Sequence, residues 1–171
     1  MNILSFDTGK NIGWNIINIY TQKLLKYGCK QFELSSIGEY CNELWWFLMQ
    51  LYDDILYPID IVRIEEPEYY GGKKGTISLK RGDLFYVQAS AITLYNFYSS
   101  HMYSSDIKVE LVTPCQWKGN LSKEATENRV KLILGDQVNH ILKMPKYKRE
   151  HIIDSIGIGL SYDKKLWELR K

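Results

Sequence analysis

Residues 3–14 have the sequence ILSFDTGKNIGW, and this segment gives the first indication of the fold. An apolar run ends at Asp7-Thr8-Gly9, which is a turn signal, and a second apolar segment extends from Gly13 to Tyr20. Both its odd-numbered and its even-numbered positions include apolar residues, which is typical of a strand buried on both faces of a sheet. Residues 23–34 can return as a third strand after a turn. The chain therefore opens with an antiparallel meander.

We expect helices and strands to alternate in the rest of the chain. Segments with apolar residues at helical spacing alternate there with short runs of β-branched residues. A capping box at Ser36 and Glu39 starts the first helix. We predict, in order, a helix from Ser36 to Pro58, a strand at 60–66, a loop at 68–80, a helix at 82–103, a strand at 107–113, a helix from Ser122 to Gly135 and a helix at 148–169. This order predicts an α/β fold with a mixed five-stranded sheet, an antiparallel meander followed by parallel strands, and helices on both faces. The length of 171 residues fits a single domain, 1–171.

Composition excludes several classes of protein but does not indicate a function. The 22 basic and 20 acidic residues give a net charge of +2, which does not point to nucleic acid. No apolar run is long enough for a membrane span, and the N-terminal run reaches a carboxylate too soon for a signal peptide. The three cysteines, Cys29, Cys41 and Cys115, form no CxxC pair, so we expect neither a zinc site nor a disulfide framework. We expect a protein of a reducing compartment, cytoplasmic or inside a host cell, and not secreted.

Three carboxylates stand at positions where apolar residues surround them. Asp7 closes the first strand, Glu65 closes the fourth, and Asp154 lies in an apolar helix. His151 is three residues before Asp154 and shares its helix face. A buried carboxylate is costly unless it is paired or binds a metal, and carboxylate oxygens suit Mg²⁺ or Mn²⁺. Each residue taken singly is also compatible with a turn, a helix cap, a solvated side chain or a core histidine.

Two glycines in the last helix, Gly157 and Gly159, add to this pattern. Each glycine destabilises a helix interior by about 1 kcal/mol relative to alanine. We interpret them as positions of close approach to the sheet, which would bring Asp154 down to the strand ends.

These segments resemble the RuvC-type Holliday junction resolvases. Residues 5–14 resemble the opening of that family, in which an aspartate precedes a glycine turn and a second strand begins with glycine and an aromatic residue. Residues 63–65 are similar to the segment of the family's second acid. His151-x-x-Asp154-Ser155 resembles the C-terminal signature, in which the first position is Asp in some members and His in others. The resemblance covers nearly the whole chain and implies a ribonuclease H-like fold. Glu65 and Glu66 both remain candidates for the second acid, and strand parity favours Glu65.

The resemblance implies a metal-dependent endodeoxyribonuclease that resolves four-way DNA junctions in recombination and repair. It implies two Mg²⁺ ions, replaceable by Mn²⁺, held by the catalytic residues Asp7, Glu65, His151 and Asp154. Two such ions clamp the attacking and leaving oxygens of a phosphodiester, and the products would carry 5′-phosphate ends. Whether His151 binds metal or orients the water stays open. Paired cutting implies a homodimer, for which the helix at 82–103 would be the interface.

Six basic residues are candidates for contact with branched DNA. Lys73, Lys74, Lys80 and Arg81 flank the loop after Glu65, and Lys118 and Lys123 follow the fifth strand. The last two resemble lysines that resolvases place near the scissile phosphate. Contacts of this kind give an affinity that falls with salt. Runs of charged residues also commonly lie on solvated surfaces that bind no partner, and this alternative applies to these basic residues too.

Three other functions remain open. A ribonuclease H-like nuclease for flaps, other branched DNA or RNA–DNA hybrids would use the same acids. Asp7-Thr8-Gly9 also resembles the phosphate-binding turn of actin-like ATPases and sugar kinases, but those need two such domains. A catalytically silent junction-binding protein would have no need of all three acids.

Overall fold

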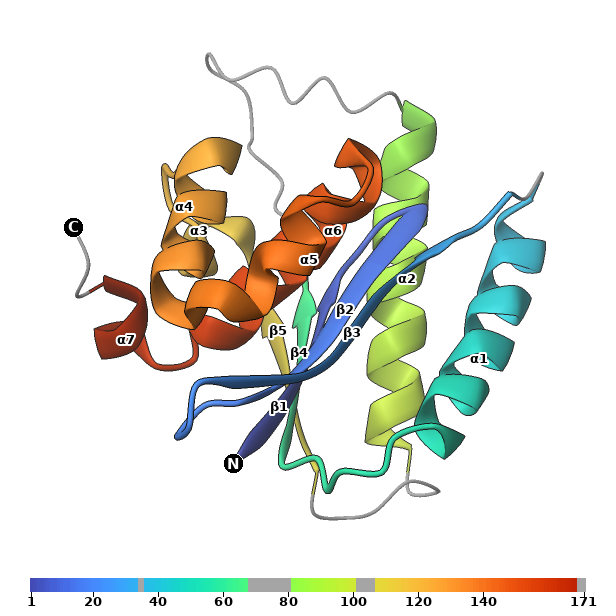
Figure 1. Cartoon of the computed structure of the whole chain (residues 1–171). Coiled ribbons are helices and arrows are strands. Elements are labelled where there is room, and N and C mark those ends of the chain that lie inside the picture. Colours follow the sequence, from blue (N-terminus) through green and yellow to red (C-terminus); the bar gives the residue numbers. More distant parts are fainter. Residues whose placement is uncertain (34–35, 68–80, 101–106, 169–171) are drawn as a thin grey trace.

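Five strands form one mixed sheet at the centre of the chain (Figure 1). The computed structural model describes residues 1–33, 36–67, 81–100 and 107–168. The strands are β1 (Asn2–Asp7), β2 (Asn11–Asn18), β3 (Lys23–Gln31), β4 (Ile61–Glu65) and β5 (Lys108–Val112), in the order β3-β2-β1-β4-β5. The first three strands pair antiparallel, whereas β4 pairs parallel with β1 and β5 pairs parallel with β4. The predicted meander followed by parallel strands is confirmed.

Helices cover both faces of this sheet, as predicted (Figure 1). They are α1 (Ile37–Asp53), α2 (Arg81–Ser99), α3 (Pro114–Trp117), α4 (Lys123–Leu134), α5 (Asn139–Leu142), α6 (Lys146–Leu160) and α7 (Lys164–Glu168), with a 3₁₀ turn at Gly135–Val138. The pair α1 and α2 lies on one face, and α6 crosses β1 and β2 on the other, backed by α4 and α5.

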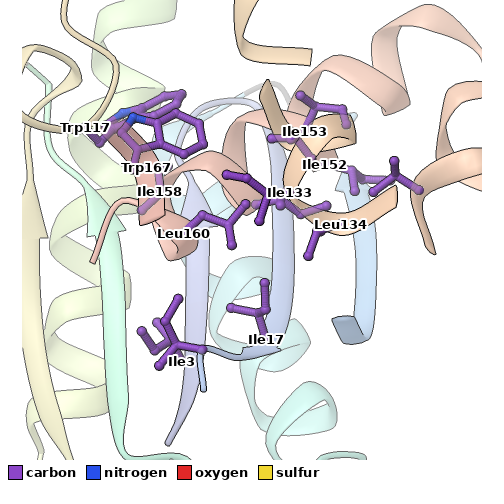
Figure 2. Close-up of a cluster of buried hydrophobic side chains, with 14 of the residues drawn as sticks. Ile3, Ile17, Trp117, Ile133, Leu134, Ile152, Ile153, Ile158, Leu160 and Trp167 are labelled. Carbon is purple, nitrogen blue, oxygen red and sulfur yellow. The ribbon is translucent and has the colours of Figure 1, made fainter. Parts of the chain in front are cut away.

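Two apolar layers follow from the alternation of side chains along each strand. Ile3 and Ile61 point into the layer under α6, which also contains the residues drawn in Figure 2. Leu4 and Val62, each one position further, point into the layer under α1 and α2. Both layers are free of solvent at their centres, since all four side chains are at least 95 % buried. Odd-numbered residues of β1 and β4 therefore face α6.

The predicted last helix is wrong as a single element, because two helices occupy its range. α6 ends at Leu160, where the guanidinium of buried Arg63 donates to the Ile158 carbonyl and to the Ser161 hydroxyl. Asp163 then accepts a hydrogen bond from the Leu166 amide at 3.1 Å and starts α7. A cation from β4 therefore satisfies the end of α6, and a new cap begins the next helix.

α2 also differs from the helix expected at 82–103. It ends at Ser99 and is not the long apolar helix that the pattern indicated. Polar residues such as Gln88 and Asn96 interrupt it. Its inner side packs on the sheet through the second apolar layer, while the outer side carries exposed apolar residues, Phe85, Ile92 and Tyr95.

The cysteines and the hydropathy of the helices are the remaining features of the fold. Cys29 and Cys41 are half-buried in the structure, and Cys115 is exposed. Within the described ranges, no helix combines the length and the hydropathy that a membrane crossing requires.

Candidate active site

The parallel pairing of β1 with β4 brings Asp7 and Glu65 together. Ser5 pairs with Arg63 and Phe6 with Ile64, so the next positions in register are the two acids. Their carboxyl groups share a hydrogen bond. Both face α6 because side chains alternate along a strand.

Glu66 lies on the other side of the sheet from this pair. It lines a groove with Gln88 and Tyr95 of α2. Its amide bonds to the Val112 carbonyl at 3.0 Å, which continues the sheet past the end of β4. The structure therefore brings Glu65, rather than Glu66, to Asp7.

α6 adds His151 and Asp154 from above the sheet. His151 Nδ1 lies 2.6 Å from Asp7 Oδ2, and Asn11 Nδ2 lies 3.4 Å from the other ring nitrogen. The helix comes this close because β2 has a glycine below it. A Cβ atom on Gly13 would stand 2.0 Å from the His151 carbonyl oxygen.

Gly159 has the role that the sequence predicted for both glycines of α6, which is close approach to the sheet, whereas Gly157 makes room for another side chain instead. A Cβ on Gly159 would lie 2.7 Å from the Ser5 hydroxyl of β1, and one on Gly157 would lie 2.6 Å from the Trp117 ring. Beneath the same helix the Asn15 amide donates to the Ser155 hydroxyl at 3.2 Å. This buried polar pair fixes the register of α6 on the sheet, and with it the position of Asp154.

Burial of the charged groups dominates the electrostatics of the site, and repulsion between the carboxylates adds to it. Burial, reinforced by the negative charge of Asp154, raises the pKa of Asp7 to about 8. Burial and the charge of Asp7 raise the pKa of Glu65 well above its usual range. Burial also raises the pKa of Asp154, against the pull of Lys118, and lowers the pKa of His151. Each group is thus pushed toward its neutral form, mainly because burial disfavours the charged form.

The two lysines predicted near the scissile phosphate take different positions. Lys118 Nζ lies 3.8 Å from Asp154 Oδ2, with its side chain 20 % exposed. Lys123 Nζ instead forms an ion pair with Glu150 at 2.8 Å, one turn before Asp154 on α6. Of these two lysines, Lys118 is therefore the one that lies directly beside the carboxylates. Lys73, Lys74 and Lys80 lie outside the described residues, and Arg81 is described only as the first residue of α2.

The donor set fits divalent cations. Three carboxyl groups and one imidazole are ligand types that Mg²⁺ and Mn²⁺ accept, and their charge would be relieved by a cation. In the described part of the chain, no three His, Cys, Asp or Glu side chains are set as a ready-made metal cage. The groups bond to one another instead, so an ion would have to replace the contact between His151 and Asp7 or the one between Asp7 and Glu65.

Three site residues were missed from the sequence. Trp117 donates from Nε1 to Glu65 Oε1 at 3.1 Å, Thr8 donates from its hydroxyl to the Glu65 carbonyl at 3.0 Å, and Asn11 contacts His151. Thr8 and Asn11 lie within residues 3–14, and their short spacing from Asp7 was a usable signal. Trp117 carried no such signal, since its contact depends on the unpredicted helix α3.

Comparison with known proteins supports the fold. No protein-family model matches the chain, and no curated protein matches it. Among solved structures, Thermus thermophilus RuvC in complex with a Holliday junction substrate matches with a TM-score of 0.66 and 18 % identity, covering 96 % of this chain and 94 % of that one. A second Thermus thermophilus RuvC structure matches at 0.61 and 18 %, over 96 % and 95 %. The yeast mitochondrial Holliday junction resolvase Ydc2 matches at 0.62 and 13 %, over 98 % of this chain and 78 % of that one. The chain therefore has the ribonuclease H-like fold of the RuvC-type Holliday junction resolvases.

Proposed function

We propose that this protein is a metal-dependent endodeoxyribonuclease that resolves four-way DNA junctions. The observation that carries the proposal is the convergence of Asp7, Glu65 and Asp154 with His151 at the carboxyl ends of β1 and β4 in a RuvC-type fold. One of the matching structures holds a Holliday junction substrate, which supports branched DNA as the partner.

The chain's own residues would hold the ions and the substrate. Asp7, Glu65, Asp154 and His151 would hold Mg²⁺ or Mn²⁺. When bound, two such ions supply an activated water and stabilise the departing 3′ oxygen, which leaves a 5′-phosphate end. The contact with Asp7 orients the His151 ring. Lys118 adds a positive charge beside Asp154, where a phosphate oxygen could approach.

DNA contact would extend from Lys118 to the other lysines predicted from the sequence. Lys123 is 64 % exposed and would reach a phosphate after leaving Glu150. Lys73, Lys74, Lys80 and Arg81 remain predicted contacts on the segment that follows Glu65. Each contact of this kind strengthens binding in a salt-dependent way.

Symmetric cutting of a junction needs two sites, and we propose a homodimer. A two-fold dimer gives two identical sites through one self-complementary surface. α2 offers exposed apolar residues for such a surface, namely Phe85, Ile92 and Tyr95.

The test compares cleavage of a four-way junction, a flap, linear duplex DNA and an RNA–DNA hybrid in Mg²⁺ or Mn²⁺. We expect the junction to be cut most rapidly, at paired sites, into products that DNA ligase can reseal. Asp7→Asn should abolish cleavage and retain junction binding. Preferred cutting of flaps or hybrids would favour the other nuclease function, and normal cleavage by Asp7→Asn would refute the mechanism.

A further inference from the structure

The ring of Trp117 is packed between α6 and α7 at the edge of the apolar layer (Figure 2). Only 2 % of its surface is exposed. Its ring centroid lies 6.3 Å from that of Trp167, and the missing side chain of Gly157 makes room for it on α6. The ring therefore has a fixed place in the core.

The polar edge of this ring is turned to the candidate active site. Nε1 donates to Glu65 Oε1 at 3.1 Å. The charged neighbours of that carboxyl group include Asp7, which repels its ionised form, and Lys118. The indole is thus a neutral donor that holds one carboxylate oxygen and leaves the second oxygen without this bond.

The short helix that carries Trp117 is itself held rigidly. The Thr113 amide donates to Gln116 Oε1 at 2.8 Å, and the Thr113 hydroxyl accepts from the Gln116 amide, which completes a capping box before Pro114. Lys118 ends the same helix and reaches Asp154. One turn of helix therefore sets groups beside two of the site's carboxylates.

We propose that Trp117 is a positioning residue for Glu65, orienting its carboxylate to receive the divalent ion. This inference rests on the proposed function, because it takes Glu65 as an ion ligand. A glutamate side chain has three rotatable bonds, so an unheld carboxylate would lose conformational freedom when the ion binds. Groups that orient a metal ligand in this way typically contribute about 10- to 100-fold in metal affinity.

The test measures Mn²⁺ binding directly, by electron paramagnetic resonance of the free ion and by calorimetry. Three variants are compared: Trp117→Phe, Trp117 replaced by 3-benzothienylalanine, and Trp167→Phe. Benzothienylalanine keeps the bicyclic ring and replaces the N–H by sulfur, so it removes the donor and retains the packing. Trp167→Phe is the matched control, since among the described contacts its indole donates to none of the four site residues.

We expect both Trp117 variants to bind Mn²⁺ about 10-fold or more weakly. Their kcat on a junction should fall at fixed ion concentration while the KM for DNA stays near the wild-type value. Excess Mn²⁺ should restore much of the rate. Trp167→Phe should keep the wild-type affinity for Mn²⁺, even if its melting temperature falls by as much as that of the Trp117 variants.

Two results would overturn the inference. One is Mn²⁺ affinity in the benzothienylalanine variant equal to that of wild type. The other is an equal loss in Trp167→Phe, which would reduce Trp117 to a core residue. Asp7→Asn distinguishes these results from failure of the proposed function. If the wild-type protein binds no Mn²⁺ at a site that is lost in Asp7→Asn, both the inference and the proposed function are overturned.

Discussion

The crowded carboxylates should make the metal-free protein less stable as the pH rises, and Asp7→Asn should weaken that dependence. The pKa of Asp7 is raised to about 8 in the folded chain, from 3.8 for the unperturbed group. Between these values the folded chain keeps a proton that the unfolded chain has released. A raised pKa stabilises the fold fully below the unfolded value, and the contribution is lost as the pH rises through the folded value.

The magnitude follows from the number of protons involved. One extra proton in the folded state lowers the free energy of unfolding by about 1.4 kcal/mol per pH unit. From pH 5 to pH 7 this amounts to about 3 kcal/mol from Asp7 alone. Asp7→Asn removes that proton and also relieves Glu65, so the slope should be shallower by at least about 1.4 kcal/mol per unit. Saturating Mg²⁺ should flatten the wild-type slope too, because ions that bind ionised carboxylates stabilise the folded state.

The assay is urea unfolding in EDTA at intervals between pH 5 and pH 8, followed by circular dichroism. Asp53→Asn is the charge-matched control, because Asp53 is exposed at the end of α1, on the far face of the sheet. The control should run parallel to wild type. A slope in Asp7→Asn equal to the wild-type slope would refute the reasoning, since burial of Asp7 would then have no consequence for its protonation.

Further predictions concern the lysines and the helix approach. Lys118→Ala should weaken junction binding and reduce the slope of log affinity against log salt by about one, measured by fluorescence anisotropy. Glu150→Gln should do the opposite, tightening binding, because it frees Lys123 from its 2.8 Å ion pair; unchanged affinity would show that Lys123 does not reach DNA. Gly13→Ala should destabilise the fold by about 3 kcal/mol in thermal unfolding, because the new Cβ would meet the His151 carbonyl at 2.0 Å; a loss under about 0.5 kcal/mol would contradict the close approach.

Strand parity made the central part of the site predictable from sequence. Alternation along β1 and β4 is a local rule, so it correctly assigns Asp7 and Glu65 to one face and Glu66 to the other. The close approach of α6 to the sheet was predictable at Gly159, but no local pattern showed that Gly157 makes room for the ring of Trp117.

Contacts between distant segments were not predictable in this way. Lys123 and Glu150 are 27 residues apart, and nothing in the local pattern announces their ion pair. Trp117 and Glu65 are 52 residues apart and meet only because α3 packs on α6. The break between α6 and α7 likewise depends on Arg63, a residue of β4 that helical spacing cannot reveal.

The central place of β1 in the sheet has a consequence for the dynamics of the molecule. β1 has a hydrogen-bonded neighbour on each side and helices on both faces, so its backbone amides can exchange with solvent only when much of the sheet opens. We therefore expect the amides of the strand that ends at Asp7 to be among the slowest-exchanging of the described chain. Asp7 thus stands on a protected central strand, whereas Lys123 is 64 % exposed and is held by an ion pair with Glu150.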